Sequence, residues 1–280
     1  MEIPKFGAVK KTRFNDVTWV SEIPSTNTAL LERARNGACE GEVIVADLQT
    51  QGRGRRGRSW TASSGTSLMM SILLRPPVDT LSPSNASLIT SALALSAVAA
   101  VDEITNVKLE VKWPNDLVVD GPQSTVDDGD PGYRKVAGIL TETLIQQGAI
   151  EAVVVGMGLN TGWGQIPPEL KQVATSLDVL SGSTVDRTQL AFKVLQNFEA
   201  EYAALLEPGG TENLLQELRK HSATLGKRVL VHMNQKTKTQ SIKGDALNID
   251  EAGRLVVKFD NGDTQVVAVA DVEHLRLDAR

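Results

Sequence analysis

The sequence predicts an α+β protein of two parts: a domain of mixed helices and strands, then a small β-domain. Helix and strand signals alternate through the first 220 residues. After Gly226 the pattern changes to five short strand-like runs at close spacing, and Asn261-Gly262 is a strong hairpin signal between two of them. The length of 280 residues suits about two domains. We therefore expect one domain at 1–222 and a second at 223–280.

Apolar and β-branched runs predict the strands of the first domain. EVIVADL at 42–48 is the clearest, and TSLMMSILL at 66–74 is a second, stopped by Pro76 and Pro77. The segment between 120 and 134 is rich in Gly, Pro, Ser and Asp, which indicates a solvated hairpin tip between two strands. Further strands are expected at 108–113, 117–119, 136–144 and 150–155.

Four helices are expected in the same domain. One begins after the polar residues 25–27, which can cap it, and ends near Gly37. The Ala- and Leu-rich run 85–103 predicts a buried helix with Ser82 or Ser84 as its cap. The other two helices are expected at 187–206 and 211–221.

The second domain consists of short strands joined by tight turns. This density of strands is typical of a small barrel, either SH3-like or OB-like. The strands are expected at 227–232, 240–248, 254–260, 264–268 and 271–277.

The composition is that of an ordinary globular protein, 41% hydrophobic and 22% charged. It excludes a disordered, collagen-like or coiled-coil chain. The net charge of −5 argues against a general polyanion binder, so a positive site must be a local concentration. The longest apolar run, 92–101, is interrupted by Ser96 and is much shorter than a membrane span.

Cysteine and histidine usage points to a reducing compartment. The single cysteine, Cys39, cannot close an intramolecular disulfide, and the three histidines have no zinc-like spacing. The N-terminus lacks the apolar core of a secretory signal. We expect a cytoplasmic protein without a protein-held metal and without a membrane partner.

The segment QTQGRGRRGRSW at 49–60 concentrates positive charge in this acidic protein. Its glycines satisfy the G-x-G-x-x-G pattern, but the residues that follow do not open a helix, so a Rossmann dinucleotide site is excluded. Arginines bind phosphate oxygens in bidentate fashion, and glycines let a loop fold over a ligand. Three interpretations remain: a loop that closes over a phosphate, an RNA-binding patch, or a solvated surface loop.

Three further clusters are candidates for a site. KWPND at 112–116 ends a strand in a rigid turn, so Lys112 is either a surface charge or a site residue. GMGLN at 156–160 follows a strand, and its glycines allow close packing or close approach of a ligand. Residues 25–27 either only cap a helix or also recognise a carbonyl or anion.

Together, and in this order, these clusters resemble the biotin–protein ligases. The resemblance runs from about residue 21 to residue 280, and it implies the mixed-sheet catalytic domain of the biotin/lipoate ligase fold with an SH3-like C-terminal domain. Cys39 lies outside the matched segments, which argues against the related octanoyltransferases with a cysteine nucleophile. The matched segments are residues 25–27, Gln49, GRGRRGRSW at 52–60, KWPND at 112–116, KVAGILTE at 135–142 and VGMGLN at 155–160.

The resemblance implies a two-step ligase reaction. Biotin and MgATP would form biotinyl-5′-AMP and pyrophosphate, and Mg²⁺ would enter with ATP. A lysine of a biotin carboxyl carrier protein domain, part of a biotin-dependent carboxylase, would then attack the mixed anhydride and release AMP. Preorganised cations would stabilise the charge of the first step, and a closed loop would keep water from the adenylate.

The matched positions also imply the residues that bind biotin. Those expected to contact biotin and its ring region are Ser25, Thr26, Asn27 and Gln49. Those expected in the loop that closes over biotin and the adenylate are Gly52, Arg53, Gly54 and Arg55.

The same resemblance implies the catalytic and nucleotide contacts. Lys112 would contact the biotin carboxylate and the α-phosphate, and Lys112 and Arg55 would be the catalytic residues. Trp60 would pack against the adenine, while Gly138 and Asn160 would line the pocket. The nucleotide-binding set is Arg55, Arg58, Trp60, Lys112 and Asn160.

Two alternatives stand beside the biotin ligase. A lipoate ligase would share the fold, although GRGRRGR-x-W favours biotin, and an RNA-binding module would use the arginines of the loop. Only 24 residues precede Ser25, which is too few for the helix-turn-helix domain of some family members, so we expect no specific DNA binding. The acidic segment 126–130 has no counterpart in the family motif and is expected to extend the hairpin.

Overall fold

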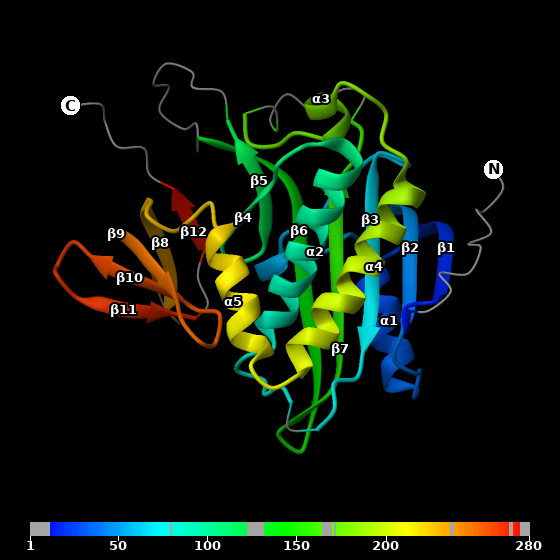
Figure 1. The fold of residues 1–280 in the computed structure, drawn as a ribbon, viewed down its shortest axis with the longest axis horizontal. Helices are drawn as coiled ribbons and strands as arrows, with labels where there is room; N and C mark the ends of the chain where they lie inside the picture. The colour runs from blue at the N-terminus through cyan, green and yellow to red at the C-terminus, as the bar shows by residue number, and fades with distance from the viewer. Residues whose placement is uncertain are drawn as a thin grey trace.

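The computed structural model of the protein describes residues 12–78, 80–121, 132–163, 170, 172–235, 238–268 and 271–274. Two β-sheets dominate this part of the chain, a mixed sheet of seven strands and an antiparallel sheet of five. The smaller sheet is formed by the C-terminal strands (Figure 1). The predicted α+β class, a mixed-sheet domain followed by a small β-domain, is confirmed.

The larger sheet contains one strand that the sequence pattern did not predict. This strand, β1, reads DVTWVSEI and is mostly half-buried or exposed, because it lies at the edge of the sheet. It pairs in parallel with β2, and all other neighbours are antiparallel. Across the sheet the order is β1-β2-β3-β7-β6-β5-β4. The bounds are β1 (Asp16–Ile23), β2 (Glu42–Gln49), β3 (Ser67–Leu74), β4 (Glu110–Lys112), β5 (Asp116–Asp120), β6 (Tyr133–Gln146) and β7 (Ala149–Asn160).

The hairpin expected between 120 and 134 joins β5 to β6. These strands are antiparallel, and Asp120 lies opposite Tyr133 at their ends. The connection therefore joins neighbouring strands as predicted, while residues 122–131, including the acidic segment, lie outside the described residues.

The helices follow the predicted runs, with one correction at a cap. Ser25 caps the first helix by accepting a hydrogen bond from the Thr28 amide at 3.4 Å, as expected. The second helix instead has Ala86 at its N-cap with no side-chain bond, so the prediction of Ser82 or Ser84 was wrong. Ser82 belongs to the preceding turn. The helices are α1 (Thr26–Arg35), α2 (Ser87–Thr105), the unpredicted α3 (Leu177–Ser181), α4 (Arg187–Leu206) and α5 (Gly210–Lys220).

Helices cover both faces of the larger sheet, because alternate strand residues point to opposite sides. Val43 and Val45 belong to the main core with α2 and α4, whereas Ile44 packs in a second cluster with Leu30 of α1. Figure 1 shows α2, α4 and α5 on the near side of this sheet.

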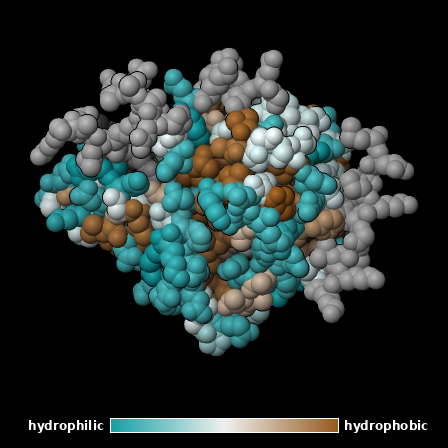
Figure 2. Space-filling view, turned by 45° about the horizontal axis from the view of Figure 1, so that its top comes forward, coloured by the Kyte–Doolittle hydropathy of each residue, from teal (hydrophilic) through white to brown (hydrophobic). Residues whose placement is uncertain are grey.

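Helix α2 is long and apolar enough to cross a membrane by length and composition, yet 72% of that stretch is buried inside the fold. It packs against α4 and β6. The molecular surface in Figure 2 is mainly hydrophilic, with apolar side chains gathered near its centre. The burial of α2 is that of a core helix in a globular domain.

The C-terminal strands form a small antiparallel sheet that is tied to the KWPND turn. Trp113 Nε1 donates a hydrogen bond to the Gly253 carbonyl at 3.0 Å, and Arg219 of α5 donates two to the Ile249 carbonyl, at 3.1 and 2.8 Å. The sheet order is β11-β10-β9-β8-β12. Its strands are β8 (Arg228–Gln235), β9 (Lys238–Ile249), β10 (Leu255–Phe259), β11 (Thr264–Val267) and β12 (Asp271–His274).

Candidate active site

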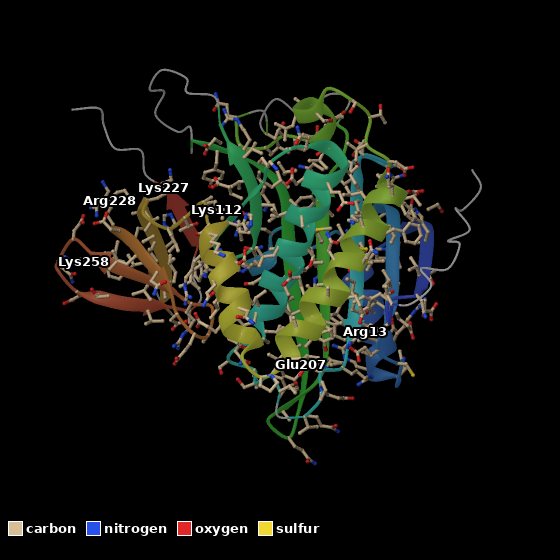
Figure 3. The ribbon with its side chains drawn as sticks, in the orientation of Figure 1. Arg13, Lys112, Glu207, Lys227, Arg228 and Lys258 are labelled. Carbon is tan, nitrogen blue, oxygen red and sulfur yellow. The ribbon has the colours of Figure 1, made fainter. Side chains whose placement is uncertain are left out.

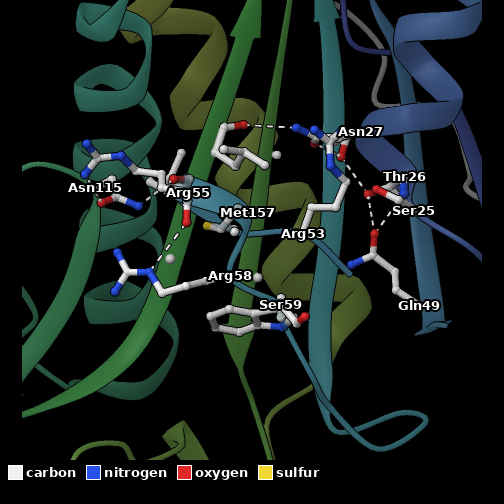
Figure 4. Close-up of a pocket in the computed structure, with 18 of the residues that line it drawn as sticks. Ser25, Thr26, Asn27, Gln49, Arg53, Arg55, Arg58, Ser59, Asn115 and Met157 are labelled. Atoms are coloured by element: carbon white, nitrogen blue, oxygen red, sulfur yellow. Dashed lines mark hydrogen bonds between the residues drawn. The ribbon is translucent and has the colours of Figure 1, made fainter. Parts of the chain in front are cut away.

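A cavity lies over the central strands of the larger sheet. It is bounded by the N-terminus of α1, by β6 and β7, and by the glycine–arginine loop, which we define as residues 52–60 (Figure 4). In Figure 4, Ser25, Thr26 and Gln49 lie at one end, and Arg55, Arg58 and Asn115 lie at the other. The cavity therefore has a polar end and a cationic end.

The polar end is a network of hydrogen bonds around the start of α1. The Thr26 amide and hydroxyl donate to Gln49 Oε1 at 2.8 and 3.1 Å, and the Thr26 hydroxyl lies 2.6 Å from that of Ser71. The Ser71 hydroxyl in turn donates to Asn27 Oδ1 at 2.6 Å. Ser25, Thr26, Asn27 and Gln49 all line the cavity, while their contact with biotin stays a prediction, and Ser71 is an addition that sequence reasoning missed.

Gly156 of β7 packs against Asn27 and Ser71 of this network, so its replacement is expected to reduce stability. A Cβ at this position would overlap Asn27 Oδ1, so we expect Gly156→Ala to reduce the free energy of unfolding by about 1–3 kcal/mol. Urea unfolding measures the loss. Adding Asn27→Ala removes the closest overlapping atoms, although Ser71 Oγ stays at 2.9 Å, and is expected to restore part of the loss. A double variant as unstable as Gly156→Ala would contradict this packing.

The glycine–arginine loop folds as a small hairpin. The Trp60 amide donates to the Gly52 carbonyl at 2.9 Å, the Gly54 amide donates to the Arg58 carbonyl at 2.7 Å, and a 3₁₀ turn (Arg55–Gly57) forms the tip. A Cβ on Gly52 would overlap the Trp60 carbonyl oxygen, so the base of the hairpin requires glycine. Gly52 therefore shapes the loop without lining the cavity, whereas Gly54, Arg58 and Trp60 line it.

The cationic end combines the loop with β5 and β6. Arg55 Nη1 donates to Asn115 Oδ1 at 3.1 Å, which docks the tip of the loop on the KWPND turn. Lys135 Nζ pairs with Asp116 Oδ1 at 2.7 Å and lies 5.6 Å from the centre of the Trp60 ring. Sequence reasoning missed Lys135, although it opens the matched segment KVAGILTE. Arg55 and Lys135 together supply positive charge beside an aromatic ring.

The Trp60 ring packs against β6 and β7 at positions where both strands carry glycine. A Cβ on Gly158 would overlap the Trp60 ring, and one on Gly138 would approach the ring to 3.2 Å. The indole Nε1 is buried and has no hydrogen-bond partner among the described residues. Trp60 and Gly138 line the cavity, and the ring offers both a flat face and a donor, while its contact with adenine stays a prediction.

Besides Gly52, the structure places two predicted site residues away from the cavity lining. Lys112 is buried near the junction with the C-terminal strands, with Nζ 5.0 Å from the centre of the Tyr133 ring (Figure 3). Asn160 is also buried; it accepts from the Ser67 hydroxyl at 3.2 Å and donates to the Thr175 carbonyl at 3.1 Å. Asn160 thus joins β7 to its neighbours, and the substrate roles of both residues stay predictions.

No group of three His, Cys, Asp or Glu side chains that could hold a metal is found among the described residues. The donor set of the cavity is instead amides, hydroxyls, guanidinium groups and one ammonium group. These groups recognise polar rings, carboxylates and phosphates.

A mixed sheet whose cavity is roofed by a glycine–arginine hairpin, followed by a small β-domain, defines the class of protein ligases that attach small carboxylic acids. The family model described as "Biotin/lipoate A/B protein ligase family" matches residues 19–160, and "Biotin protein ligase C terminal domain" matches residues 224–275. The chain belongs to the biotin/lipoate A/B protein ligase family.

Individual relatives agree with this assignment. A biotin–[acetyl-CoA-carboxylase] ligase of Mycobacterium tuberculosis is 35% identical over 92% of this chain and 88% of its own length. A bifunctional ligase/repressor BirA of Bacillus subtilis is 30% identical over 96% of this chain and 77% of its own. The biotin protein ligase of Aquifex aeolicus, solved with biotin and ATP, has a TM-score of 0.73 at 26% identity and covers 94% of this chain and 100% of that one.

Proposed function

We propose that this protein is a biotin–protein ligase. It activates biotin with MgATP to biotinyl-5′-AMP, releases pyrophosphate, and transfers biotin to a lysine of a biotin carboxyl carrier protein domain. The observation that carries the proposal is one cavity that joins a polar, hydrogen-bonding end to a cationic end under the glycine–arginine loop. A biotin-sized acid fits this division, because its ring needs neutral hydrogen-bonding groups and its carboxylate needs cations.

The first step is the attack of the biotin carboxylate on the α-phosphorus of ATP, with pyrophosphate as the leaving group. Negative charge gathers between two anions, so a fixed cation stabilises the transition state. The resemblance gives this role to Lys112, and Lys135, which Asp116 holds at 2.7 Å beside Trp60, is a second candidate cation because it lines the cavity. Arg55 and Arg58 come from the loop, and Trp60 offers its ring to the adenine.

The second step is the attack of the carrier lysine on the carbonyl carbon of the mixed anhydride, with AMP as the leaving group. The anhydride also reacts with water, so its lifetime depends on how well the loop covers it. No enzyme-bound covalent intermediate is needed, which agrees with the absence of Cys39 from the cavity lining.

The remaining expectations concern partners and organisation. The carrier domain is expected to belong to a biotin-dependent carboxylase, and Mg²⁺ to arrive with ATP. The net charge of −5 and the free cysteine support a cytoplasmic enzyme without sequence-specific DNA binding. We place the boundary between the catalytic domain, 1–222, and the C-terminal domain, 223–280.

The decisive experiment incubates the protein with ATP, biotin and an isolated carrier domain. Mass spectrometry is expected to show one added biotinyl group on the carrier, and pyrophosphate release is expected to require both biotin and ATP. Lipoate replaces biotin in a parallel reaction. Transfer of lipoate alone would overturn the choice of substrate, and RNA binding without any acyl transfer would overturn the enzyme.

Ligand-dependent protection of the loop is a second prediction. Arg56 and Arg58 are exposed at its tip, and their charges repel each other, so trypsin is expected to cut there in the free protein. Biotin with ATP is expected to slow this cleavage, because the adenylate phosphate neutralises the arginines. Mass spectrometry of the fragments provides the measurement, with ATP alone as the control. Equal cleavage with and without the ligands would contradict closure.

A further inference from the structure

Glu142 of β6 has no part in the reaction described above, yet it contacts both the start of α1 and the glycine–arginine loop. Its Oε2 accepts a hydrogen bond from Asn27 Nδ2 at 3.0 Å. The same carboxylate binds Arg53 of the loop in a two-point pair, Oε1 to Nη2 at 2.7 Å and Oε2 to Nη1 at 3.1 Å. In Figure 4 the Arg53 side chain extends toward Asn27. One carboxylate therefore links Asn27 of α1 to Arg53 of the glycine–arginine loop.

The first consequence concerns the orientation of the Asn27 amide. An ionised carboxylate only accepts hydrogen bonds, so the side of the amide that faces Glu142 must be the NH₂ group. The second proton of that group is donated to the Leu140 carbonyl at 3.2 Å. Both donors are thus used, and Asn27 keeps its oxygen toward Ser71 and the cavity. Without the carboxylate, the amide loses the shorter of the two contacts that require its NH₂ group on this side, and only the Leu140 carbonyl remains.

The second consequence concerns the loop. A bidentate guanidinium–carboxylate pair fixes both position and angle, so Glu142 sets where the first arginine of the loop lies. Arg53 makes one further contact on the same side, to the Thr28 hydroxyl at 3.3 Å. The opposite side of the loop is docked separately, by Arg55 on Asn115 at 3.1 Å. Glu142 is therefore the main anchor of the loop at the polar end.

These bonds form one continuous path. It runs from Gln49, which accepts from the Thr26 amide, through the Thr26 and Ser71 hydroxyls to Asn27 and Glu142, and then to Arg53 of the loop. No step along the path is longer than 3.0 Å. A ligand that engages the polar end acts on the same hydrogen-bond network that holds the loop.

We infer that Glu142 is a positioning residue that couples recognition at the polar end to closure of the glycine–arginine loop. Together with the Leu140 carbonyl, Glu142 holds Asn27 with its oxygen as an acceptor, which favours a ligand that presents an N–H group there. By holding Arg53, Glu142 also keeps the loop closed over that ligand. The inference rests on the proposed function for the identity of the ligand, whereas the anchoring of the loop is independent of it.

The test compares Glu142→Ala with a matched ion pair elsewhere. Glu42 pairs with Arg33 at 3.0 Å, and the side chains are 20% and 47% exposed, against 22% and 45% for Glu142 and Arg53. Glu42→Ala therefore removes an equally exposed pair outside the site. Thermal unfolding of both variants checks that the fold is intact.

Two readouts separate coupling from a general structural effect. Without any ligand, trypsin cleavage at Arg56 and Arg58 is expected to rise about threefold or more in Glu142→Ala and to stay unchanged in Glu42→Ala. Calorimetry is expected to show about tenfold weaker biotin binding in Glu142→Ala, since a hydrogen bond from Asn27 to a charged group is lost in a partly buried network. In turnover, KM for biotin is expected to rise while KM for ATP stays the same.

A double variant and a conservative variant complete the design. If Arg53 acts through Glu142, cleavage in Arg53→Ala with Glu142→Ala is expected to equal that of Glu142→Ala alone, because both changes remove the same bond. Glu142→Gln has one accepting oxygen and is expected to lie between wild type and Glu142→Ala in both readouts.

Specific outcomes would overturn the coupling. Loop cleavage in Glu142→Ala equal to that in Glu42→Ala would show that Glu142 does not anchor the loop. Additive effects in the double variant would show that Arg53 and Glu142 act separately. Absence of biotin binding by the wild-type protein would instead reject the proposed substrate, and the ligand-free cleavage would still decide whether Glu142 anchors the loop.

Discussion

Replacing Lys135 by alanine is expected to slow formation of biotinyl-5′-AMP by about 100- to 1000-fold. The ammonium group is fixed by Asp116 and faces the cationic end of the cavity, where charge develops as carboxylate and α-phosphate react. Removing one such preorganised stabiliser typically costs about 2.7–4 kcal/mol of transition-state binding. Single-turnover measurement of pyrophosphate release reports this step separately from transfer to the carrier.

Lys112→Ala is the matched comparison for this prediction. The family resemblance gave the carboxylate and phosphate contact to Lys112, whereas Lys135 lines the cavity and Lys112 does not. If Lys135 is the acting cation, Lys112→Ala is expected to change stability more than adenylation. Near-normal adenylation by a folded Lys135→Ala protein, together with severely impaired adenylation by Lys112→Ala, would show that Lys112 is the acting cation.

Arg55→Ala is expected to release biotinyl-5′-AMP about 10- to 100-fold faster. The guanidinium docks the loop on Asn115 and lines the cavity, so its loss removes hydrogen bonds to a charged group and leaves one side of the roof unattached. The escaped adenylate is expected to label lysines of a bystander protein, which mass spectrometry detects. Rapid gel filtration of the enzyme–adenylate complex gives the rate of release.

Arg56→Ala serves as the control for this loop variant. Arg56 is exposed at the same turn and does not line the cavity. It is expected to retain the adenylate as wild type does. Equal retention by the Arg55→Ala and wild-type enzymes would mean that the loop does not seal the site.

Local sequence patterns predicted most of the secondary structure. Helix α4 occupies the predicted run, 187–206, because an apolar face and the Asp186 cap are local features. Strand β1 was missed because it lies at the sheet edge, where only partial burial weakens the apolar alternation. The cap of α2 was missed because nearby serines suggest a cap, whereas Ser82 forms a turn with Asn85.

The sequence by itself determined the composition class, the order of the motifs, and the residues that line most of the cavity. These motifs are short, and the properties that mark them as site candidates belong to the residues themselves. Glycine allows close approach, arginine binds anions, and polar residues cap a helix. That is why the sequence alone was enough to assign Ser25, Asn27, Gln49 and the glycine–arginine loop to the site.

Only the tertiary structure decided which lysine reaches the cavity. The reason is a β-bulge: β6 pairs Asp116 with Gly138 and Leu117 with Ala137, but then Val118 with Lys135. Strict alternation would turn Lys135 away from Gly138, whereas the extra residue brings both to one face, so that a Cβ on Gly138 would lie 3.0 Å from Lys135 Nζ. A register shift depends on the partner strand, and no local period in the sequence reports it.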